Sequence, residues 1–304
     1  MTASRLVSRA TWQGSLDGFL DRIRENNSAA DSSGLSSVTV EGKCIGLVKP
    51  EFCEKLKAYP EVFQAVGNGQ SFQVNAALHS SAARTEAVAG VMEDLRQKGA
   101  IEGWRNELYP VTESFNREPL LLVERAAATY LGIKAYGVHI NGWSQTQQGI
   151  ELWVARRSPT KQKWPGKLDH LAAGGQPHGL SCKDNVVKEC AEEASIPAEL
   201  AKKAIPTGVV SYTADQPEGC KRDVLFCYDL ELPQDFQPEP KDGEVESFQR
   251  MPLQQVAELV SNTQEFKINC NLVIIDFLVR HGFLTPEHHG YLSLVSGLRQ
   301  GNCS

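Results

Sequence analysis

Three glutamates within residues 187–196 are spaced so that they fall on one face of a helix. Glu189, Glu192 and Glu193 stand at i, i+3 and i+4, which are neighbouring positions on a helix surface. Their like charges repel, and only Lys188 of the same helix is placed to pair with them. A hard cation such as Mg²⁺ takes carboxylate oxygens as ligands and would relieve this repulsion. Taken alone, the cluster also fits an ordinary solvated helix face, which is the commoner use of such charges.

The segment before this helix favours the metal interpretation. Residues 168–179 read as a strand that ends in Gly174 and Gly175, followed by a helix that begins near Ser181 or Asp184. We expect the two glycines to form a turn, because glycine lets a backbone approach a phosphate or a metal closely. The sequence therefore predicts an acidic helix face beside a glycine turn.

Together these residues resemble the Nudix box, G-x5-E-x7-R-E-U-x-E-E-x-G-U, in which U is aliphatic. Gly174 falls on the first glycine, Glu189 on the glutamate after Arg, and Glu192 and Glu193 on the paired glutamates. The resemblance implies that these three carboxylates bind Mg²⁺, with Mn²⁺ as an alternative. It also implies a backbone carbonyl ligand, at Gly174 by the count of residues or at Gly175.

Four positions depart from the box. Leu180 stands where the family has its first glutamate, Lys188 replaces the arginine, Cys190 takes an aliphatic position and Ser195 replaces the last glycine. Lys188 can still pair with a glutamate, but as a point charge without the bidentate fork of arginine. We interpret Cys190 as a core residue, because it turns toward another face of the helix. These departures cast doubt on the efficiency of the site more than on its metal-binding face.

A second acidic segment follows at residues 242–248. In a regular strand Glu244 and Glu246 point to the same face, where both can enter one site, although two solvent-facing glutamates on an edge strand fit equally simply. In Nudix enzymes an acidic residue downstream of the box supplies a further ligand or base. The resemblance favours Glu244 for this role, with Glu246 as a second candidate that contacts substrate.

Hydrophobic periodicity and turn residues predict the elements that position these groups. Helices are expected at residues 15–24, 50–58, 60–66, 81–97, 184–194, 198–204, 253–261, 267–280 and 287–298. Strands are expected at 43–48, 72–78, 120–127, 137–143, 149–156, 207–213, 222–230 and 244–250, and a loop at 25–37. This order predicts an α+β protein with a mixed sheet between helices. We place a small N-terminal α+β domain at 1–114, and the resemblance implies a Nudix α/β/α sandwich at 115–304.

Charge, cysteine content and hydropathy argue against a nucleic-acid-binding, disulfide-bonded or membrane-spanning protein. The chain has 304 residues and a net charge of -6 without a basic stripe, which argues against nucleic-acid binding. Its eight cysteines contain no CxxC pair and read as reduced thiols of an intracellular protein. No apolar run reaches the ~20 residues of a membrane span. We expect a cytoplasmic monomer or homodimer, while an N-terminal stretch without acidic residues leaves organelle import open.

The histidines do not form a recognisable ligand pattern. His170 and His178 flank the two glycines, whereas His281, His288 and His289 lie near the C-terminus without metal-ligand spacing. Hard cations also prefer carboxylates to imidazole. We therefore interpret His170 as a residue that faces the pocket or the core.

A wider resemblance covers nearly the whole chain. Segments 104–110, 136–143, 210–212, 226–233 and 242–248 look like the Nudix subfamily that carries an extra N-terminal domain. That unit is related in fungi to the part fused to thiamine pyrophosphokinase. The resemblance implies a hydrolase that removes phosphate from thiamine diphosphate, preferentially from its oxidised forms.

The implied mechanism assigns roles to a few residues. Two or three Mg²⁺ ions would lie across a diphosphate, and Lys188 would orient a neighbouring glutamate. Trp104 is a candidate to stack on the aromatic ring of the substrate, and Gly175 to approach its phosphates. An ADP-ribose or nucleoside-diphosphate-sugar pyrophosphatase and a silent Nudix binding module remain as alternatives, the latter because of the departures from the box. Isopentenyl diphosphate isomerase shares the fold, but its catalytic cysteine and metal-binding histidines lack convincing counterparts.

Overall fold

A mixed sheet forms the centre of the molecule. The computed structural model describes residues 11–29, 33–67 and 71–301. The strands run in the order β11 (Ile205–Gln216), β12 (Gly219–Glu231), β7 (Lys134–Thr146), β8 (Gly149–Arg157) and β13 (Val245–Pro252). Strands β12 and β7 are parallel and the other neighbours are antiparallel, so the predicted mixed sheet is confirmed.

Two short strands enter this sheet where β7 and β8 separate. Residues 142–146 of β7 pair with β8, whereas residues 137–140 pair with β10 (Ala172–Gly175). The far half of β8 pairs with β9 (Leu168–Asp169). Gly174 and Gly175 are therefore strand residues opposite Val138 and Gly137, and the predicted glycine turn is wrong. Their backbone is fixed by the ladder with β7 instead of by a turn.

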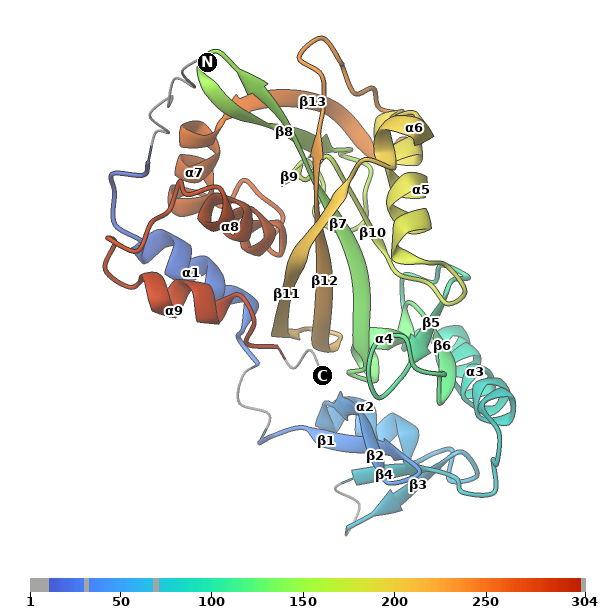
Figure 1. Ribbon diagram of the computed structural model, residues 1–304. Coiled ribbons are helices and arrows are strands. Elements are labelled where there is room, and N and C mark those ends of the chain that lie inside the picture. The colour runs from blue at the N-terminus through green and yellow to red at the C-terminus, as the bar shows by residue number, and fades with distance from the viewer. Residues whose placement is uncertain (1–10, 30–32, 68–70, 302–304) are drawn as a thin grey trace.

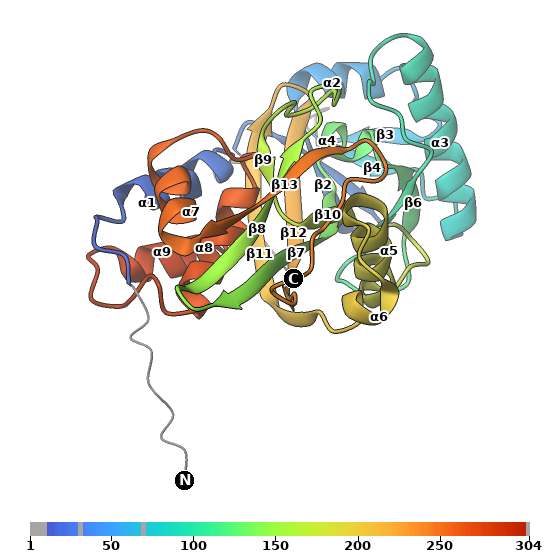
Figure 2. The ribbon, with the colours of Figure 1, turned by 90° about the horizontal axis from the view of Figure 1, so that it is seen from above.

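Helices cover both faces of the sheet (Figures 1 and 2). One face carries α5 (Cys182–Ala194) and α6 (Ala198–Ala201). The other carries α1 (Asp17–Asn26), α7 (Leu253–Asn262), α8 (Cys270–Arg280) and α9 (Tyr291–Gly297). The predicted α/β/α sandwich is thus confirmed, because each helix buries an apolar stripe against the sheet.

The N-terminal module is a second α+β unit below the sandwich in Figure 1. Its sheet has the order β2 (Lys43–Val48), β1 (Ser36–Val40), β4 (Ser71–Val74) and β3 (Phe63–Val66). With it pack α2 (Pro50–Leu56), α3 (Ser81–Gln97), α4 (Ala127–Tyr130) and a hairpin of β5 (Leu108–Val111) and β6 (Leu121–Glu124). The predicted small N-terminal α+β unit is confirmed.

Two local predictions in this module are wrong. Residues 60–66 were expected to be helical, but Phe63–Val66 form β3 and pair with β4. Residues 36–37, assigned to a loop, begin β1. In both places tertiary strand pairing outweighs a weak local preference.

The buried cores do not divide the chain at residue 114. The module's core continues through the β5–β6 hairpin to Ile133, and α1 joins the other core through Phe19 and Ile23. Helix α1 contacts α7, α8 and α9, so an N-terminal segment completes the C-terminal unit. Among the described residues, no helix is long and apolar enough to cross a bilayer.

Candidate active site

Helix α5 is held in place at both ends and along one face. The Ser181 hydroxyl caps its first turn by accepting from the Asp184 N–H at 3.1 Å. Val186, Cys190 and Ala194 are buried against the sheet, which confirms the core role of Cys190. Burial raises the pKa of the Cys190 thiol to about 12, so this thiol is not a nucleophile. The adjoining face of the helix, which is turned toward β10, carries Glu189 and Glu193.

Glu189 lies directly over β10. A Cβ placed on Gly174 would stand 2.1 Å from the Glu189 Oε1 atom, so any other residue at position 174 would displace the carboxylate. Burial raises the pKa of Glu189 above its usual value, although Lys188 acts in the opposite direction. The glycine of the box is therefore needed for close approach rather than for a turn.

Glu193 is the most strongly perturbed of the three acids. Its Oε2 atom accepts a hydrogen bond of 3.0 Å from the Ala173 N–H in β10. Burial, followed by the negative charge of Asp169, raises its pKa well above the usual value, and Glu189 and Glu244 add to the effect. A half-buried carboxyl that faces three other acids is a costly arrangement without a cation.

Glu192 lies at the exposed edge of the group. Lys188 Nζ is 3.1 Å from Glu192 Oε2 and 3.0 Å from Glu189 Oε1. The expected pairing of Lys188 with its neighbouring glutamates is therefore present. One lysine is shared between two carboxylates, which leaves the face under-neutralised.

Glu244 lies just before β13, where its carbonyl accepts a hydrogen bond of 2.8 Å from the Ser158 N–H at the end of β8. Burial acts to raise its pKa, but Lys161 at 2.6 Å holds that pKa below its usual value. Glu246 is exposed and lies where a β-bulge shifts the pairing of β13 with β8. The regular alternation that placed both glutamates on one face is broken there.

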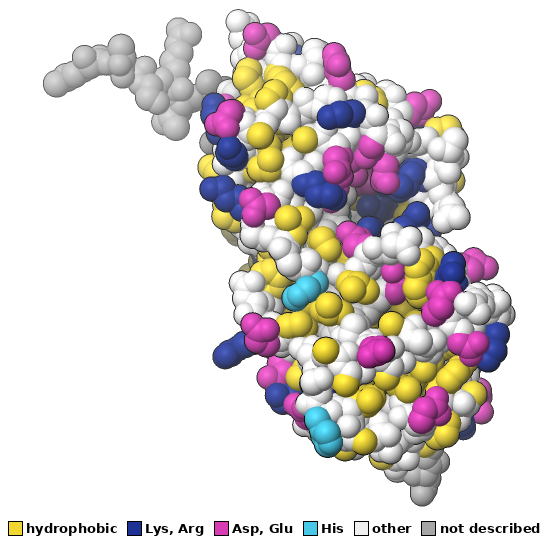
Figure 3. Space-filling view, turned by 90° about the vertical axis from the view of Figure 1, so that its right-hand side faces the viewer, with side chains coloured by type: hydrophobic (Ala, Val, Ile, Leu, Met, Phe, Trp, Pro, Cys, Tyr) yellow, Lys and Arg dark blue, Asp and Glu magenta, His cyan; other side chains and the backbone are white. Residues whose placement is uncertain are grey.

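The predicted acids thus converge on one region. The charges of Glu189 and Glu244 both raise the pKa of Glu193, so carboxylates from α5 and from the segment before β13 are close enough to interact. Figure 3 faces the α5 side of the molecule and shows acidic and basic side chains gathered around a hollow above the N-terminal module. The catalytic and metal-binding roles of these residues stay predictions.

The donor set fits a hard divalent cation. Carboxylate oxygens of Glu189, Glu192, Glu193 and Glu244 are the ligands that such ions prefer. The Gly175 carbonyl accepts a hydrogen bond of 2.8 Å from Asn185 Nδ2, so it is already engaged by the protein. Burial raises the pKa values of Glu189 and Glu193, the neighbouring carboxylates add to the shift, and a bound cation would favour the ionised form of both groups.

Trp104 makes its contacts inside the N-terminal module. Its Nε1 donates to Asn106 Oδ1 at 3.1 Å, and the Arg96 guanidinium lies 5.1 Å from its ring centroid. The side chain also packs on the module's core. Its proposed stacking on a substrate ring stays a prediction.

Sequence reasoning missed two residues of the β5–β6 hairpin that face the glutamates. A Cβ on Gly175 would overlap the Tyr109 hydroxyl, so the phenol touches the backbone of β10. Arg125 lies 5.8 Å from the Tyr109 ring centroid and pairs with Glu107 at 2.8 Å. The positive charge of Arg125 acts to lower the pKa of both Glu189 and Glu244, and in Glu189 it opposes the larger effect of burial. No spacing in the sequence links this hairpin to α5, because the contact is purely tertiary.

A cavity of about 520 Å³ lies elsewhere, between the N-terminal module and the β11–β12 hairpin. Its described lining includes Lys49, Phe52, Asp215 and Glu218 and none of the predicted site residues. The acidic face therefore lies outside this cavity.

Comparison with known proteins gives two family matches. Residues 135–270 match the NUDIX domain, and residues 18–135 match a domain of unknown function, DUF4743. The boundary between these matches lies near Ile133, where the buried core of the N-terminal module ends.

Two plant proteins are similar along nearly the whole chain. The chain is 47% identical over 307 residues to Nudix hydrolase 20, chloroplastic, of Arabidopsis thaliana, covering 98% of this chain and 82% of that protein. It is 47% identical over 290 residues to Nudix hydrolase 24, chloroplastic, of the same plant, covering 95% and 80%. Among solved structures, the NUDIX domain of Shewanella oneidensis NrtR complexed with ADP ribose aligns with a TM-score of 0.39 at 14% identity, covering 49% of this chain and 88% of that one.

Proposed function

The chain belongs to the Nudix hydrolase family and hydrolyses phosphoric anhydrides, and we propose that its substrate is thiamine diphosphate, preferentially in oxidised form. The products would be the monophosphate and phosphate. The hydrolytic site is supported by the positions of Glu189 and Glu193 against β10, with Glu244 near enough to raise the pKa of Glu193. The choice of substrate rests on the resemblance to the Nudix subfamily related to the unit fused to fungal thiamine pyrophosphokinase.

Nudix enzymes use divalent metals, and we propose Mg²⁺, with Mn²⁺ as an alternative. Glu189, Glu192, Glu193 and Glu244 would hold it, together with the Gly174 carbonyl. Bound there, the metal supplies an activated water and neutralises phosphate charge. Lys188 holds Glu189 and Glu192 in position, and Lys161 keeps Glu244 ionised, so that Glu244 can act as a ligand or as a proton acceptor.

The N-terminal module supplies the substrate side of the site in this proposal. Arg125 is the cation of the β5–β6 hairpin that acts on Glu189 and Glu244, and a guanidinium is suited to a phosphate oxygen. Tyr109 fixes the hairpin against Gly175. The module would thereby bind a substrate phosphate opposite the glutamates.

A substrate panel tests the assignment. The protein is incubated with Mg²⁺ and thiamine diphosphate, its oxidised analogues, ADP-ribose or oxidised nucleotides, and monophosphate and free phosphate are measured. We expect the highest kcat/KM with the oxidised thiamine diphosphates and no turnover by Glu192→Gln of unchanged fold. Higher kcat/KM with ADP-ribose would replace the substrate assignment, and full activity of Glu192→Gln would refute the metal site.

Arg125→Ala tests the role of the module. Loss of a charged contact to phosphate is worth about 2 kcal/mol, so kcat/KM should fall by roughly 30-fold. Arg117→Ala is the matched control, because Arg117 is an exposed arginine in the loop between β5 and β6 and is not among the main charges that shift the pKa values of Glu189 and Glu244. Equal kcat/KM for both variants would remove Arg125 from the substrate site.

Trp104→Ala tests the proposed stacking on the substrate ring. Unchanged substrate affinity in this variant would show that Trp104 has no stacking role.

A silent binding module is the second candidate, and the replacements at Leu180, Lys188 and Ser195 favour it. Tight binding of a diphosphate from the panel without turnover of any compound would establish that function in place of hydrolysis.

The location of the protein is a separate proposal. Both plant relatives are named chloroplastic, which supports organelle import over the cytoplasmic location expected from the sequence. Fluorescence of the natural full-length protein carrying a C-terminal tag distinguishes the two: signal in the cytosol alone would overturn import.

A further inference from the structure

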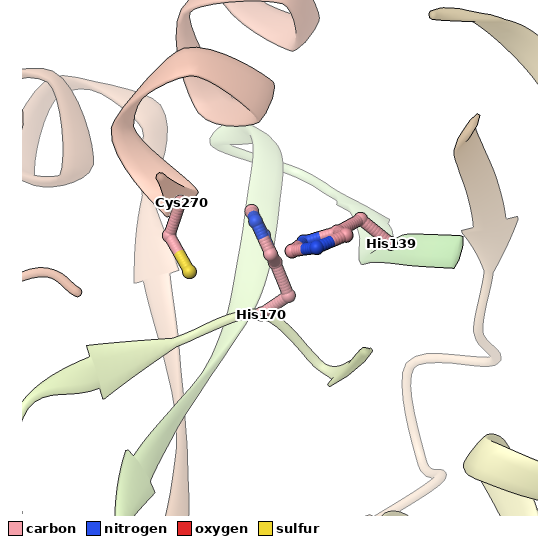
Figure 4. A group of neighbouring side chains, drawn as sticks. All are labelled: His139, His170 and Cys270. Carbon is pink, nitrogen blue, oxygen red and sulfur yellow. The ribbon is translucent and has the colours of Figure 1, made fainter. Parts of the chain in front are cut away.

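A second group of metal-ligating side chains lies in the interior of the sandwich. His139 comes from β7, His170 from the bend between β9 and β10, and Cys270 is the first residue of α8. Their ligand atoms all lie within 4.8 Å of one another. Figure 4 shows the two imidazole rings and the sulfur pointing toward one another.

This group is on the opposite face of the sheet from α5. Val138 and Ile140 belong to the core under α5, so His139 between them points the other way. Cys270 belongs to the core under α8. The cluster therefore lies across the sheet from the glutamates of α5, and the neighbouring Asp169 is an acid that acts on both groups.

Both histidines have buried nitrogens without a partner. His139 and His170 are each 4% exposed, and within the described residues His139 Nδ1 and His170 Nε2 make no hydrogen bond. An unmet buried polar atom costs about 1–3 kcal/mol. Burial lowers the pKa of both rings, that of His170 to about 4, so both imidazoles are neutral at neutral pH and have a lone pair for a metal.

Charged side chains surround the sulfur. The Cys270 thiol donates to Asp169 Oδ1 at 2.8 Å, and Asp169 also pairs with Arg157 at 2.8 Å and Lys267 at 3.2 Å. Loss of the thiol proton on metal binding would end this hydrogen bond and leave the sulfur and the Asp169 carboxylate as neighbouring anions, whose charges the bound cation, Arg157 and Lys267 would offset.

We propose that His139, His170 and Cys270 form a second metal site, which binds a thiophilic transition-metal cation and not Mg²⁺. Two imidazole nitrogens and one thiolate suit Cu⁺ or Zn²⁺, whereas hard cations prefer oxygen ligands. Binding forms a metal–sulfur bond and releases the thiol proton to solvent.

Charge balance selects between these cations. Exchange of one proton for Cu⁺ leaves the net charge of the buried group unchanged, whereas exchange for Zn²⁺ adds one positive charge beside Arg157 and Lys267. Added buried charge is costly, so Cu⁺ is the preferred occupant.

The geometry requires only small adjustments. With metal–nitrogen distances of about 2.0 Å and a metal–sulfur distance of about 2.3 Å, ligand atoms around one ion lie roughly 3.5 Å apart. The three groups must close by about 1 Å, within the reach of side-chain torsions. The bound ion would tie β7, the β9–β10 bend and the start of α8 together.

Metal binding by the intact protein tests the site. The starting protein carries Cys44→Ser and Cys303→Ser, so that neither of these thiols takes up the probe. It is titrated anaerobically with Cu⁺ against a competing chelator, and in parallel with Zn²⁺, in excess Mg²⁺. We expect one equivalent of Cu⁺ per chain, an X-ray absorption spectrum with one sulfur and two imidazole nitrogens, and a rise of several degrees in Tm.

Variants assign the ligands. Cys270→Ser keeps a hydroxyl donor for Asp169 and should lower Cu⁺ affinity by at least about 100-fold, as should His170→Gln. Cys53→Ser is the control, because Cys53 is equally buried but lies in the N-terminal module, and it should bind as the starting protein does. Glu192→Gln should also bind normally, which separates this site from the acidic face.

Two results overturn the proposal. One is Cu⁺ and Zn²⁺ binding by the starting protein no tighter than by folded Cys270→Ser. The other is a metal spectrum without sulfur. Zn²⁺ bound more tightly than Cu⁺, and lost in Cys270→Ser, would keep the site and overturn the charge preference.

Discussion

The carboxylates on the two faces of the central sheet differ in how fully positive side chains neutralise them. On the α5 face, Glu189 and Glu192 share Lys188, and the Glu193 carboxylate accepts a hydrogen bond from the backbone N–H of Ala173. On the α8 face, Asp229 binds Arg280 through both oxygens, and Asp276 binds Arg280 and Arg299.

The pKa values follow this division. Burial raises the pKa of Glu189 and Glu193, whereas His281 and Arg280 hold the pKa of Asp229 below its usual value in spite of its burial. Paired acids stabilise the fold, while under-neutralised acids store repulsion that a cation can relieve. The difference separates the part of the sandwich built for stability from the part built for binding.

Glu193→Gln gives the largest expected effect on activity. It removes the most perturbed carboxylate of the α5 face, and loss of a metal ligand worth several kcal/mol should lower kcat by about 10²–10³-fold. The metal-free variant should be at least as stable as the natural protein, because a repulsive buried charge is gone. Steady-state kinetics and urea unfolding in EDTA measure the two effects. The control is Glu199→Gln, at an exposed position on α6 where the side chain pairs with Lys202, and a large loss of stability in Glu193→Gln would show that this acid serves the fold.

Asp229→Asn should have the reverse outcome on the α8 face. It leaves Arg280 partly uncompensated, so the free energy of unfolding should fall by about 3–5 kcal/mol. The kcat of the remaining folded protein should be unchanged. Urea denaturation followed by circular dichroism measures this change, and Glu199→Gln, which breaks an exposed pair with Lys202, provides a control without measurable effect. A decrease of less than about 1 kcal/mol in the free energy of unfolding would show that the paired acids of the α8 face do not stabilise the fold more than those of the α5 face.

The pH dependence of stability should separate the faces without mutation. The raised pKa values of Glu189 and Glu193 contribute stability that is fully present below their unfolded value of about 4.3 and is lost as pH rises through the folded values. The lowered pKa of Asp229 contributes stability that is present above about 3.9 and is lost as pH falls through its folded value.

The difference in the free energy of unfolding between Mg²⁺ and EDTA isolates the glutamates, because His139 and His170, whose pKa values burial lowers, change stability in the opposite sense as pH falls from 7 toward 5 in both solutions. The stabilisation by saturating Mg²⁺ should be largest at pH 7 and should shrink as pH falls, because protonated glutamates no longer bind the cation. Urea titrations across this range measure the profile. Identical profiles with EDTA and Mg²⁺ would contradict cation binding at the α5 face.

Ser195→Gly should give the smallest effect. Ser195 ends α5 with φ at +54°, in the left-handed region where a non-glycine residue costs about 1 kcal/mol. The variant should gain about that much stability, and kcat should change less than about twofold because the glutamates stay in place. Thermal unfolding and kinetics measure both. Ser195→Ala keeps the strain and should gain nothing, and an equal gain in both variants would refute the backbone explanation.

The sequence identified most elements and the acidic face because both depend on local spacing. Helix α3 was predicted with the observed bounds, and the i, i+3, i+4 positions of Glu189, Glu192 and Glu193 follow from helix geometry alone. Ser195 at the box's glycine position could also be read directly, although its strained backbone could not. These features need no knowledge of distant contacts.

Other features exist only in the folded chain. Gly174 and Gly175 were read as a turn, but strand pairing with β7 fixes their backbone, and Glu189 and Tyr109 approaching from other elements explain why they are glycines. Arg125 reaches the glutamates because the β5–β6 hairpin docks on the loop after β10, where the His178 N–H donates to the Leu108 carbonyl.

The sequence by itself thus determined the family resemblance and the acidic helix face, because periodicity and spacing act within a few residues. Only the tertiary structure decided which carboxylates are neutralised and which are not. It also brought His139, His170 and Cys270 together from three elements. The physical reason is that burial and charge pairing depend on neighbours that are remote in sequence, and these neighbours set the pKa values and metal preferences of the side chains.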